Sequence, residues 1–377
     1  MADDAHPTEA LIHLDRLTHN IRLLQEIAGG RPLWPAIKAN AYGHGAEIVA
    51  RHLVGLGIDT LCVAHVSEAA ALRRAGIEAA LITLSASLPA QAPAIVATGV
   101  EPTVCTAETA TALAAEATRQ GREVAVHLKV DTGMGRVGIR PDEVPAFLDH
   151  CDGLPSLHVK GVMSHFASAD EADKTYSEAQ TKRFLSVAEA ARARGVALCH
   201  LANSAGIFDL AQSHLDAVRP GIAIYGLAPS GDIANPRVAE LRPVLDWTSR
   251  ITYLKEVPAG TGLSYGHSFH TEHPSLIATI PVGYGDGLHR GLSNRCSFLV
   301  HGRPCPQVGR ITMDQSLIDV TALRGQAALG DEVAIIGRQG EATATADEFA
   351  ATLDTINYEI VTAIAARVLR RAVDGIA

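Results

Sequence analysis

The sequence lacks the paired cysteines on which disulfide frameworks and zinc sites depend. Its cysteines are scattered singly, with no C-x-x-C pair, at Cys62, Cys105, Cys151, Cys199, Cys296 and Cys305. Buried, reduced thiols are the simplest expectation for residues spaced in this way. The cysteine pattern therefore predicts neither a disulfide framework nor a metal site.

Basic runs and long apolar runs are missing as well. The 377 residues carry a formal net charge of -9 and no stripe of lysine or arginine, so nothing favours nucleic-acid binding. No apolar stretch is long enough to span a bilayer. Residues 1–10 are acidic and lack the positive segment and apolar stretch of a signal peptide. We therefore expect a soluble, cytoplasmic protein.

Short apolar runs alternate with helical patterns through the first two-thirds of the chain. The strands that we expect are Ala10–Leu14, Leu33–Lys38, Thr60–Ala64, Ala80–Leu84, Glu101–Cys105, Val124–Val130, Leu157–Met163, Ala197–Leu201 and Ala217–Tyr225. The amphipathic helices between them include Asp15–Ala28, Ser67–Ala75, Ala107–Gln120 and Thr175–Arg194. Such β–α units imply a parallel sheet, either an open doubly wound one or a closed barrel. The strand count favours an α/β fold with a (β/α)8 TIM-type barrel, which leaves the first strand free to pair with a second domain.

The rhythm of the pattern changes near residue 238. From there on, short strands and turns dominate, at Trp247–Lys255, Leu276–Val282, Ser297–Val300, Gln307–Met313 and Glu332–Ile336. Two helices, near Ala346–Leu353 and Tyr358–Arg371, close the chain. We therefore expect a barrel domain over residues 1–238 and a mainly β domain over residues 239–377.

Three short patterns match known signatures in the wrong context. Residues 133–138 fit G-x-G-x-x-G, but a proline soon afterwards delays the helix that a dinucleotide site requires. Residues 262–266 fit G-x-S-x-G, but an irregular polar stretch follows where a nucleophile elbow needs a helix. His267, His270 and His273 have no Asp or Cys at ligand spacing, so an exposed loop is the better interpretation than a metal site.

The segment 35–45 (PAIKANAYGHG) carries the strongest chemical signal. Lys38 ends an apolar strand, and a tyrosine and glycines follow it in a turn. Catalytic residues of barrels lie at the carboxyl ends of strands. A partly desolvated lysine there can lose its proton and attack an aldehyde, although a plain surface lysine at a strand end fits the same pattern.

This segment resembles the cofactor-lysine signature of alanine racemases, whose fold is a barrel followed by a β domain. Motifs similar to that family recur in the same order along nearly the whole chain: 129–136 (KVDTGMGR), 164–167 (SHFA), 202–205 (ANSA), 219–226 (RPGIAIYG), 264–266 (SYG), 283–287 (GYGDG), 313–315 (MDQ) and 357–360 (NYEI). The resemblance implies a homodimeric isomerase that interconverts L-alanine and D-alanine and supplies D-alanine for peptidoglycan. It implies pyridoxal 5'-phosphate (PLP) as the cofactor.

The resemblance also implies a role for individual residues. Lys38 would carry PLP, and the cofactor phosphate would be bound by Tyr42, Ser204, Gly221, Ile222 and Tyr358. Arg219 would donate to the pyridine nitrogen, because a guanidinium keeps its protons. The implied cofactor site also includes His165, Asn203 and Tyr225, although Asn203 and Ser204 could equally be an ordinary loop or helix cap.

For racemisation, the resemblance implies one proton-transfer group on each face of Cα. Lys38 would serve one face, and Tyr265, contributed by a second subunit, would serve the other. A chain through His165 to Arg219 would supply positive potential to the phenol. The resemblance further implies a substrate site in which Arg136 and the Met313 N–H hold the carboxylate. Lys129, which is often carbamylated in the family, would orient Arg136. Tyr284 and Tyr358 would form a narrow gate.

Three departures from the family pattern concern substrate preference rather than catalytic groups. Thr312 stands where a cysteine is frequent, Phe269 where a tyrosine is frequent, and Leu369 where a proline often precedes the arginine. A racemase for another small amino acid, such as serine, therefore stays open. A barrel-type PLP decarboxylase usually places an acid at the pyridine nitrogen, so Arg219 argues against it. A non-catalytic PLP carrier would resemble the barrel alone, and the second domain with Tyr265 argues against that.

Overall fold

The computed structural model describes residues 6–373, which divide into two compact units. Residues 17–41 and 46–242 form one unit, called here the barrel unit. The described residues of the other, the β unit, are 6–16, 42–45 and 243–373. Within the part of the chain that is described, no helix combines the length and the apolar character needed to cross a membrane.

A ring of parallel strands forms the centre of the barrel unit. Six of them pair in the order β2-β3-β4-β5-β6-β7. Their bounds are Thr60–Val63 (β2), Ala80–Ala86 (β3), Glu101–Val104 (β4), Val124–Lys129 (β5), Leu157–Met163 (β6) and Leu198–His200 (β7). Parallel bridges join Leu33 to Val218, Ala36 to Cys62, and His200 to Ala217. Two extended segments therefore lie between β7 and β2 and complete the ring. The expected (β/α)8 barrel fold is confirmed.

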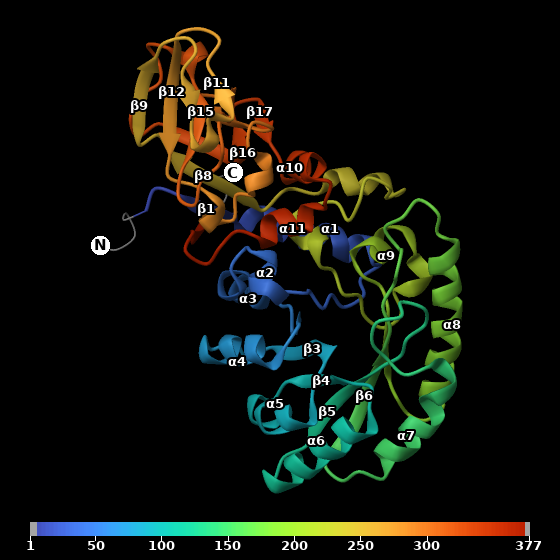
Figure 1. The fold of residues 1–377 in the computed structure, drawn as a ribbon. Helices are drawn as coiled ribbons and strands as arrows, with labels where there is room; N and C mark the ends of the chain where they lie inside the picture. Colours follow the sequence, from blue (N-terminus) through green and yellow to red (C-terminus); the bar gives the residue numbers. More distant parts are fainter. Residues whose placement is uncertain (1–5, 374–377) are drawn as a thin grey trace. The chain divides into compact units, whose positions relative to one another are not determined.

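Helices cover the outside of the barrel strands, as Figure 1 shows for α4 to α8 around β3 to β6. The helices are α1 (Leu14–Ile27), α3 (Ala46–Gly55), α4 (Val66–Arg74), α5 (Ala92–Thr98), α6 (Ala107–Arg119), α7 (Val144–Asp152), α8 (Thr175–Arg192) and α9 (Ser204–Asp209). Gly76, Gly121 and Gly195 follow three of them with positive φ angles, as the sequence predicts for helix ends. With helices outside, a strand such as β2 is buried along its whole length.

The β unit is built on two antiparallel or mixed sheets. One has the order β14-β13-β16-β8-β1-β18, with β17 paired to β16, and the other has the order β15-β12-β9. The strands are β1 (Glu9–His13), β8 (Leu245–Arg250), β9 (Tyr253–Val257), β12 (Ser275–Ile280), β13 (Ser297–Val300), β14 (Arg303–Pro306), β15 (Ser316–Asp319), β16 (Glu332–Gln339), β17 (Ala342–Ala344) and β18 (Leu369–Val373). A two-stranded ribbon joins β10 (Gly262–Leu263) to β11 (Phe269–His270), and α10 (Ala346–Leu353) and α11 (Asn357–Thr362) complete the unit.

Several expected elements differ in the structure. The helix expected over Tyr358–Arg371 ends with α11, and its last part is instead β18, which pairs in parallel with β1. The strand expected over Ala217–Tyr225 forms bridges only at its first two residues, because Pro220 cannot donate to a ladder and residues 222–225 turn into a short 3-10 helix. The strand expected over Trp247–Lys255 is divided between β8 and β9. The segment Gln307–Met313, also expected to be a strand, forms a single β-bridge, at Gln307.

Candidate active site

Most of the candidate residues of the barrel unit follow the carboxyl ends of its strands. Lys129 ends β5 and Arg136 lies in the loop after it. His165 follows β6, and Arg219 follows the bridge at Val218. Because parallel strands present their carboxyl ends at one rim, the fold brings these polar groups to the same side of the barrel.

Lys38 begins a backbone turn of an unusual kind. The four residues after it, Ala39 to Tyr42, all have φ angles between 52 and 55°. Left-handed conformation costs a residue with a side chain about 1–2 kcal/mol, so this turn is strained. Contacts of the barrel unit hold it: the Ala39 N–H donates to Glu68 over 2.7 Å, and the Asn40 side chain accepts from the Ala46 N–H over 2.8 Å. Strain of this type is maintained where the position of a side chain matters, here that of Lys38.

Positive charges are concentrated around the Lys38 amine. Burial and the nearby charge of Arg136 lower the pKa of Lys38. Burial, followed by the charges of Arg219 and Arg136, lowers the pKa of Lys129 far below its usual range. The pKa of His165 is also well below its ordinary value, because of burial and the charges of Lys129 and Arg219. Arg136 and Arg219 therefore give the rim a positive potential, which suits an anionic ligand.

The buried guanidinium of Arg219 has three acceptors. It donates to the Nδ1 of His200 over 2.6 Å, and to the carbonyls of Ser164 and Leu201 over 2.6 and 3.1 Å. Burial lowers the pKa of Arg219 to about 10, which leaves it charged at neutral pH. Among the residues that the structure describes, no hydrogen bond joins His165 directly to Arg219, as the expected chain would require. Arg219 instead binds the ring of His200. Sequence reasoning missed His200, although it lies in an expected strand.

The turn after Arg219 is fixed to the start of α9. The Ser204 hydroxyl accepts from the N–H groups of Gly221 and Ala223 over 2.8 and 3.3 Å. The Asn203 side chain accepts from the Gly206 N–H over 2.9 Å, which makes Asn203 a helix cap. Ile222 is buried in this turn.

Tyr225 connects the turn after Arg219 to the extended segment that precedes Lys38. The Tyr225 ring is fully buried, and its hydroxyl donates to the carbonyl of Ala36 over 2.9 Å. Ala36 lies two residues before Lys38. Tyr225 therefore supports the backbone that leads to Lys38.

The β unit holds the candidate tyrosines. The rings of Tyr42 and Tyr358 lie 6.2 Å apart, and Tyr358 is on α11. Tyr265 follows Ser264, whose φ is 59°, in the turn between β10 and β11, and Tyr265 is 72% exposed. Tyr284 is also partly exposed, at 44%. Within its own unit, Tyr265 therefore projects from a turn instead of packing in a core.

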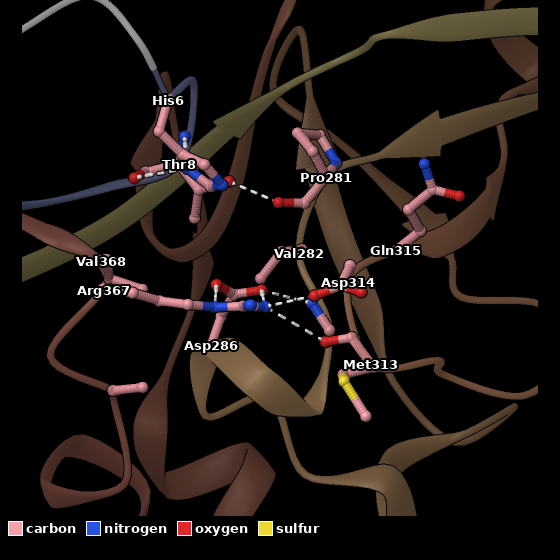
Figure 2. A network of polar contacts seen from close by, with 12 residues as sticks. His6, Thr8, Pro281, Val282, Asp286, Met313, Asp314, Gln315, Arg367 and Val368 are labelled. Carbon is pink, nitrogen blue, oxygen red and sulfur yellow. Dashed lines mark hydrogen bonds and ion pairs between the residues drawn. The ribbon is translucent and has the colours of Figure 1, made fainter.

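Arg367 holds together the two turns that carry Tyr284 and Met313, as Figure 2 shows for Asp286, Met313 and Asp314. Its guanidinium donates to both carboxylate oxygens of Asp286, over 2.6 and 3.0 Å, and to the Met313 carbonyl over 3.3 Å. The Tyr284 N–H donates to the carbonyl of Thr312 over 3.0 Å. The Met313 backbone is therefore fixed by an ion-pair network that the sequence patterns did not indicate.

Comparison with known proteins places the whole chain in one family. Residues 12–229 match the family of alanine racemase N-terminal domains, and residues 244–372 match alanine racemase C-terminal domains. The alanine racemase 2 of Caldanaerobacter subterraneus subsp. tengcongensis is 42% identical over 374 residues, covering 98% of this chain and 96% of the relative. The alanine racemase of Desulfovibrio desulfuricans is 44% identical over 367 residues, with 97% of each chain covered.

Solved structures agree with this assignment. The alanine racemase of Streptomyces coelicolor aligns over 100% of both chains with a TM-score of 0.92 and 35% identity. The Bacillus anthracis alanine racemase with bound L-Ala-P aligns with a TM-score of 0.89 and 36% identity, covering 96% of this chain and 94% of that one. With matches to both domain families and to relatives along nearly its full length, the chain belongs to the alanine racemase family of isomerases.

Proposed function

We propose that the enzyme racemises alanine with PLP held covalently by Lys38, and with Lys38 and Tyr265 as its two proton-transfer groups. The observation that carries the proposal is the position of Lys38, at the rim of a barrel with its pKa lowered by burial and by Arg136. A lysine in these surroundings has a larger fraction of neutral, nucleophilic amine than an exposed lysine. Such an amine can condense with an aldehyde.

The charge of the rim supports the binding of an anionic cofactor such as PLP. The positive charges of Arg136 and Arg219 would balance the negative charge of the cofactor and substrate. We assign the phosphate to the hydroxyl and backbone groups of Ser204, Gly221 and Ile222 and to the hydroxyls of Tyr42 and Tyr358. Asn203, His165 and Tyr225 would shape the site. Bound PLP would supply an electron sink for the negative charge that develops at Cα.

The two proposed bases act on opposite faces of the substrate. The Nζ of Lys38 removes or returns the Cα proton on one face, and the phenol oxygen of Tyr265 does so on the other. The exposed turn that carries Tyr265 supports a role outside its own unit. We therefore propose a homodimer in which Tyr265 of one subunit reaches the site of its partner.

The substrate carboxylate would be held by Arg136 and by the N–H of Met313. Lys129 would orient Arg136 as a carbamate, formed when its neutral amine adds carbon dioxide and releases a proton. This change would convert a Lys–Arg repulsion into an attraction, and the low pKa of Lys129 supports it because burial favours the reactive neutral amine. Tyr284 and Tyr358 would form the gate that favours a small side chain.

The test of the cofactor assignment is chemical trapping. We expect the purified protein to be yellow, and borohydride to fix the cofactor irreversibly on the peptide that contains Lys38. A Lys38→Ala variant should take up no label, whereas a Lys160→Ala variant should be labelled normally. Label on any lysine other than Lys38 would refute the assignment.

The shared site can be tested with mixed subunits. Lys38→Ala and Tyr265→Phe homodimers should each be severely impaired. Unfolding and refolding the two variants together should restore activity, because half of the sites in a mixed dimer would combine two intact groups. A fully active monomer, or mixtures with no more activity than their components, would contradict the arrangement.

Substrate preference and physiological role follow from the same site. A ratio of kcat/KM that favours serine over alanine would assign the enzyme to the alternative substrate. We also propose that the enzyme supplies D-alanine for peptidoglycan in the cytoplasm. Loss of the encoding gene should then make growth depend on added D-alanine, unless a second racemase is present.

A further inference from the structure

A chain of hydrogen bonds runs through the interior of the barrel, from Arg219 to the amino-terminal end of β4. Arg219 Nη1 lies 2.6 Å from His200 Nδ1, and His200 Nε2 lies 3.0 Å from His127 Nδ1. His127 Nε2 lies 2.9 Å from Glu101 Oε2, and the other carboxylate oxygen of Glu101 accepts from Lys160 over 2.5 Å. The chain therefore connects Arg219 to a carboxylate that the proposed mechanism does not use.

The direction of every hydrogen bond in this chain follows from its two ends. A guanidinium only donates, so His200 Nδ1 must accept, and the proton of a neutral His200 then lies on Nε2. His127 Nδ1 must accept that proton, so His127 donates from Nε2 to the Glu101 carboxylate. Both imidazoles are consequently neutral Nε2–H tautomers. Burial agrees, because it lowers the pKa of both histidines.

The two rings are closely packed in the core of the barrel. Both imidazoles have no exposed surface. The Trp34 ring contacts them edgewise, with centroids 4.8 Å from His200 and 6.0 Å from His127. A Cβ on Gly161 would lie 2.6 Å from His127 Nδ1, so only glycine on β6 admits this ring. The chain is therefore a built feature of the barrel core.

Glu101 is the one negative charge in this chain. Its side chain is 16% exposed, and that of Lys160 is 37% exposed. Burial raises the pKa of Glu101, but hydrogen bonds from His127 and Lys160 outweigh it and keep that pKa below its ordinary value. An ionised acceptor at one end of a buried chain polarises each hydrogen bond along it. The negative end thus makes His200 Nδ1 a stronger acceptor for Arg219.

We propose that Glu101 is a positioning residue for racemisation, which acts through His127 and His200 to fix the orientation and charge of Arg219. The inference rests on the proposed function, in which Arg219 donates to the pyridine nitrogen. Glu101 itself touches neither cofactor nor substrate in this scheme. It balances the buried charge of Arg219 at a distance and holds the guanidinium in one orientation.

The first test needs no cofactor. In nitrogen NMR spectra of the isotopically labelled protein, we expect His127 and His200 to be Nε2–H tautomers at neutral pH, before and after PLP is added. A protonated imidazolium or an Nδ1–H tautomer at either position would overturn the proposal. This result does not depend on activity, so it separates failure of the chain from failure of the proposed function.

The second test compares matched variants of the holoenzyme. Glu101→Gln removes the charge, and we expect kcat to fall about tenfold while KM for alanine changes less than twofold. The nitrogen resonance of the PLP ring should shift in the same variant. Glu116→Gln, which removes a carboxylate that pairs with Arg119 on α6, should behave like wild type. An unchanged ring-nitrogen resonance with kcat within twofold of wild type in Glu101→Gln would overturn the proposal.

Discussion

Ser204 illustrates how a single hydroxyl can fix a backbone turn. Its oxygen accepts from two buried N–H groups, those of Gly221 and Ala223. In the cofactor-free protein, Ser204→Ala should leave both donors without an acceptor and lower the free energy of unfolding by about 1–3 kcal/mol. Urea unfolding curves measure the change.

Ser177 on α8 is the matched control for Ser204. Its hydroxyl is buried and has no hydrogen-bond partner among the residues that the structure describes. Ser177→Ala should therefore leave the unfolding free energy nearly unchanged. Equal effects of the two substitutions would show that the Ser204 hydroxyl does not hold the turn.

At the residue scale, the sequence could predict those groups that motifs mark. Lys38 was singled out because it lies in a distinctive segment at the end of an expected strand, and Arg219 because the segment 219–226 resembles a motif of the alanine racemase family. The hydrogen bonds from Arg219 to His200 and from His200 to His127 were missed, although both histidines lie in expected strands. Their pairing depends on the register of β5, β6 and β7 and on the space above Gly161, and no local pattern encodes either.

At the scale of elements, the loop after β5 presents Arg136. The Asp131 carboxylate accepts from the N–H groups of Gly133 and Met134, each over 2.8 Å. Asp131→Asn should loosen this loop and raise KM for alanine more than it lowers kcat, with kcat/KM falling roughly threefold to tenfold. Steady-state kinetics in both directions measure the effect.

Asp142 offers the control for this loop. It lies in the chain segment just beyond, is exposed, and pairs with Arg140. Asp142→Asn should leave kcat/KM within the error of wild type. A loss in kcat alone in Asp131→Asn would place the role of this residue elsewhere than in substrate binding.

The ion-pair network of the β unit leads to a further prediction about substrate binding. Arg367 engages the nearly fully buried carboxylate of Asp286 through two parallel hydrogen bonds and also binds the Met313 carbonyl. Arg367→Lys keeps the charge but loses the planar fork, so KM for alanine should rise roughly fivefold with a smaller change in kcat. Arg338→Lys, whose partner Glu341 is 99% exposed, should have no effect. Unchanged KM in Arg367→Lys would separate this network from substrate binding.

The errors in predicting elements have a common physical origin. Residues 369–373 are rich in helix formers, yet they form β18 because the backbone of β1, at the opposite end of the chain, supplies a strand partner. Helix propensity is worth a few tenths of a kcal/mol per residue, and sheet pairing outweighs it. Short apolar runs were sufficient to predict the buried barrel strands, because both faces of these strands are covered.

At the scale of the whole molecule, strand count and order predicted the barrel correctly, but the interleaving of the units has no local signal. Tyr42–Gly45 belongs to the β unit although barrel residues flank it on both sides. A Cβ on Gly43 would lie 2.0 Å from the carbonyl oxygen of Val361, so a distant segment explains why glycine is needed there. The need for glycine at position 43 therefore depends on the tertiary contact with Val361 and cannot be predicted from the neighbouring residues in the sequence.

The pH dependence of stability is a property of the whole molecule that the buried histidines determine. Burial holds the folded-state pKa of His127 and His200 below 6.5, whereas in the unfolded chain both titrate near that value. Below about pH 6.5 the unfolded chain therefore binds more protons than the folded one, and acid destabilises the fold. Each histidine should contribute a slope of up to about 1.4 kcal/mol per pH unit, while depressed carboxylates such as Glu101 contribute only below about pH 4.5.

Unfolding free energies measured from about pH 7.5 to about pH 5.5 isolate the histidine contribution. Stability should be highest at the upper end and fall steadily toward the lower end. His200→Gln should lower stability at all pH values because it breaks the chain to Arg219, but it should also flatten the slope by one titrating group. Substitution of the exposed His158 by Gln should leave the slope unchanged. A flat profile for the unsubstituted enzyme over this range would mean that the buried imidazoles accept protons in the folded state. That result would contradict the tautomers derived for both rings, because the Arg219 guanidinium can only donate to His200 and leaves no site there for a second proton.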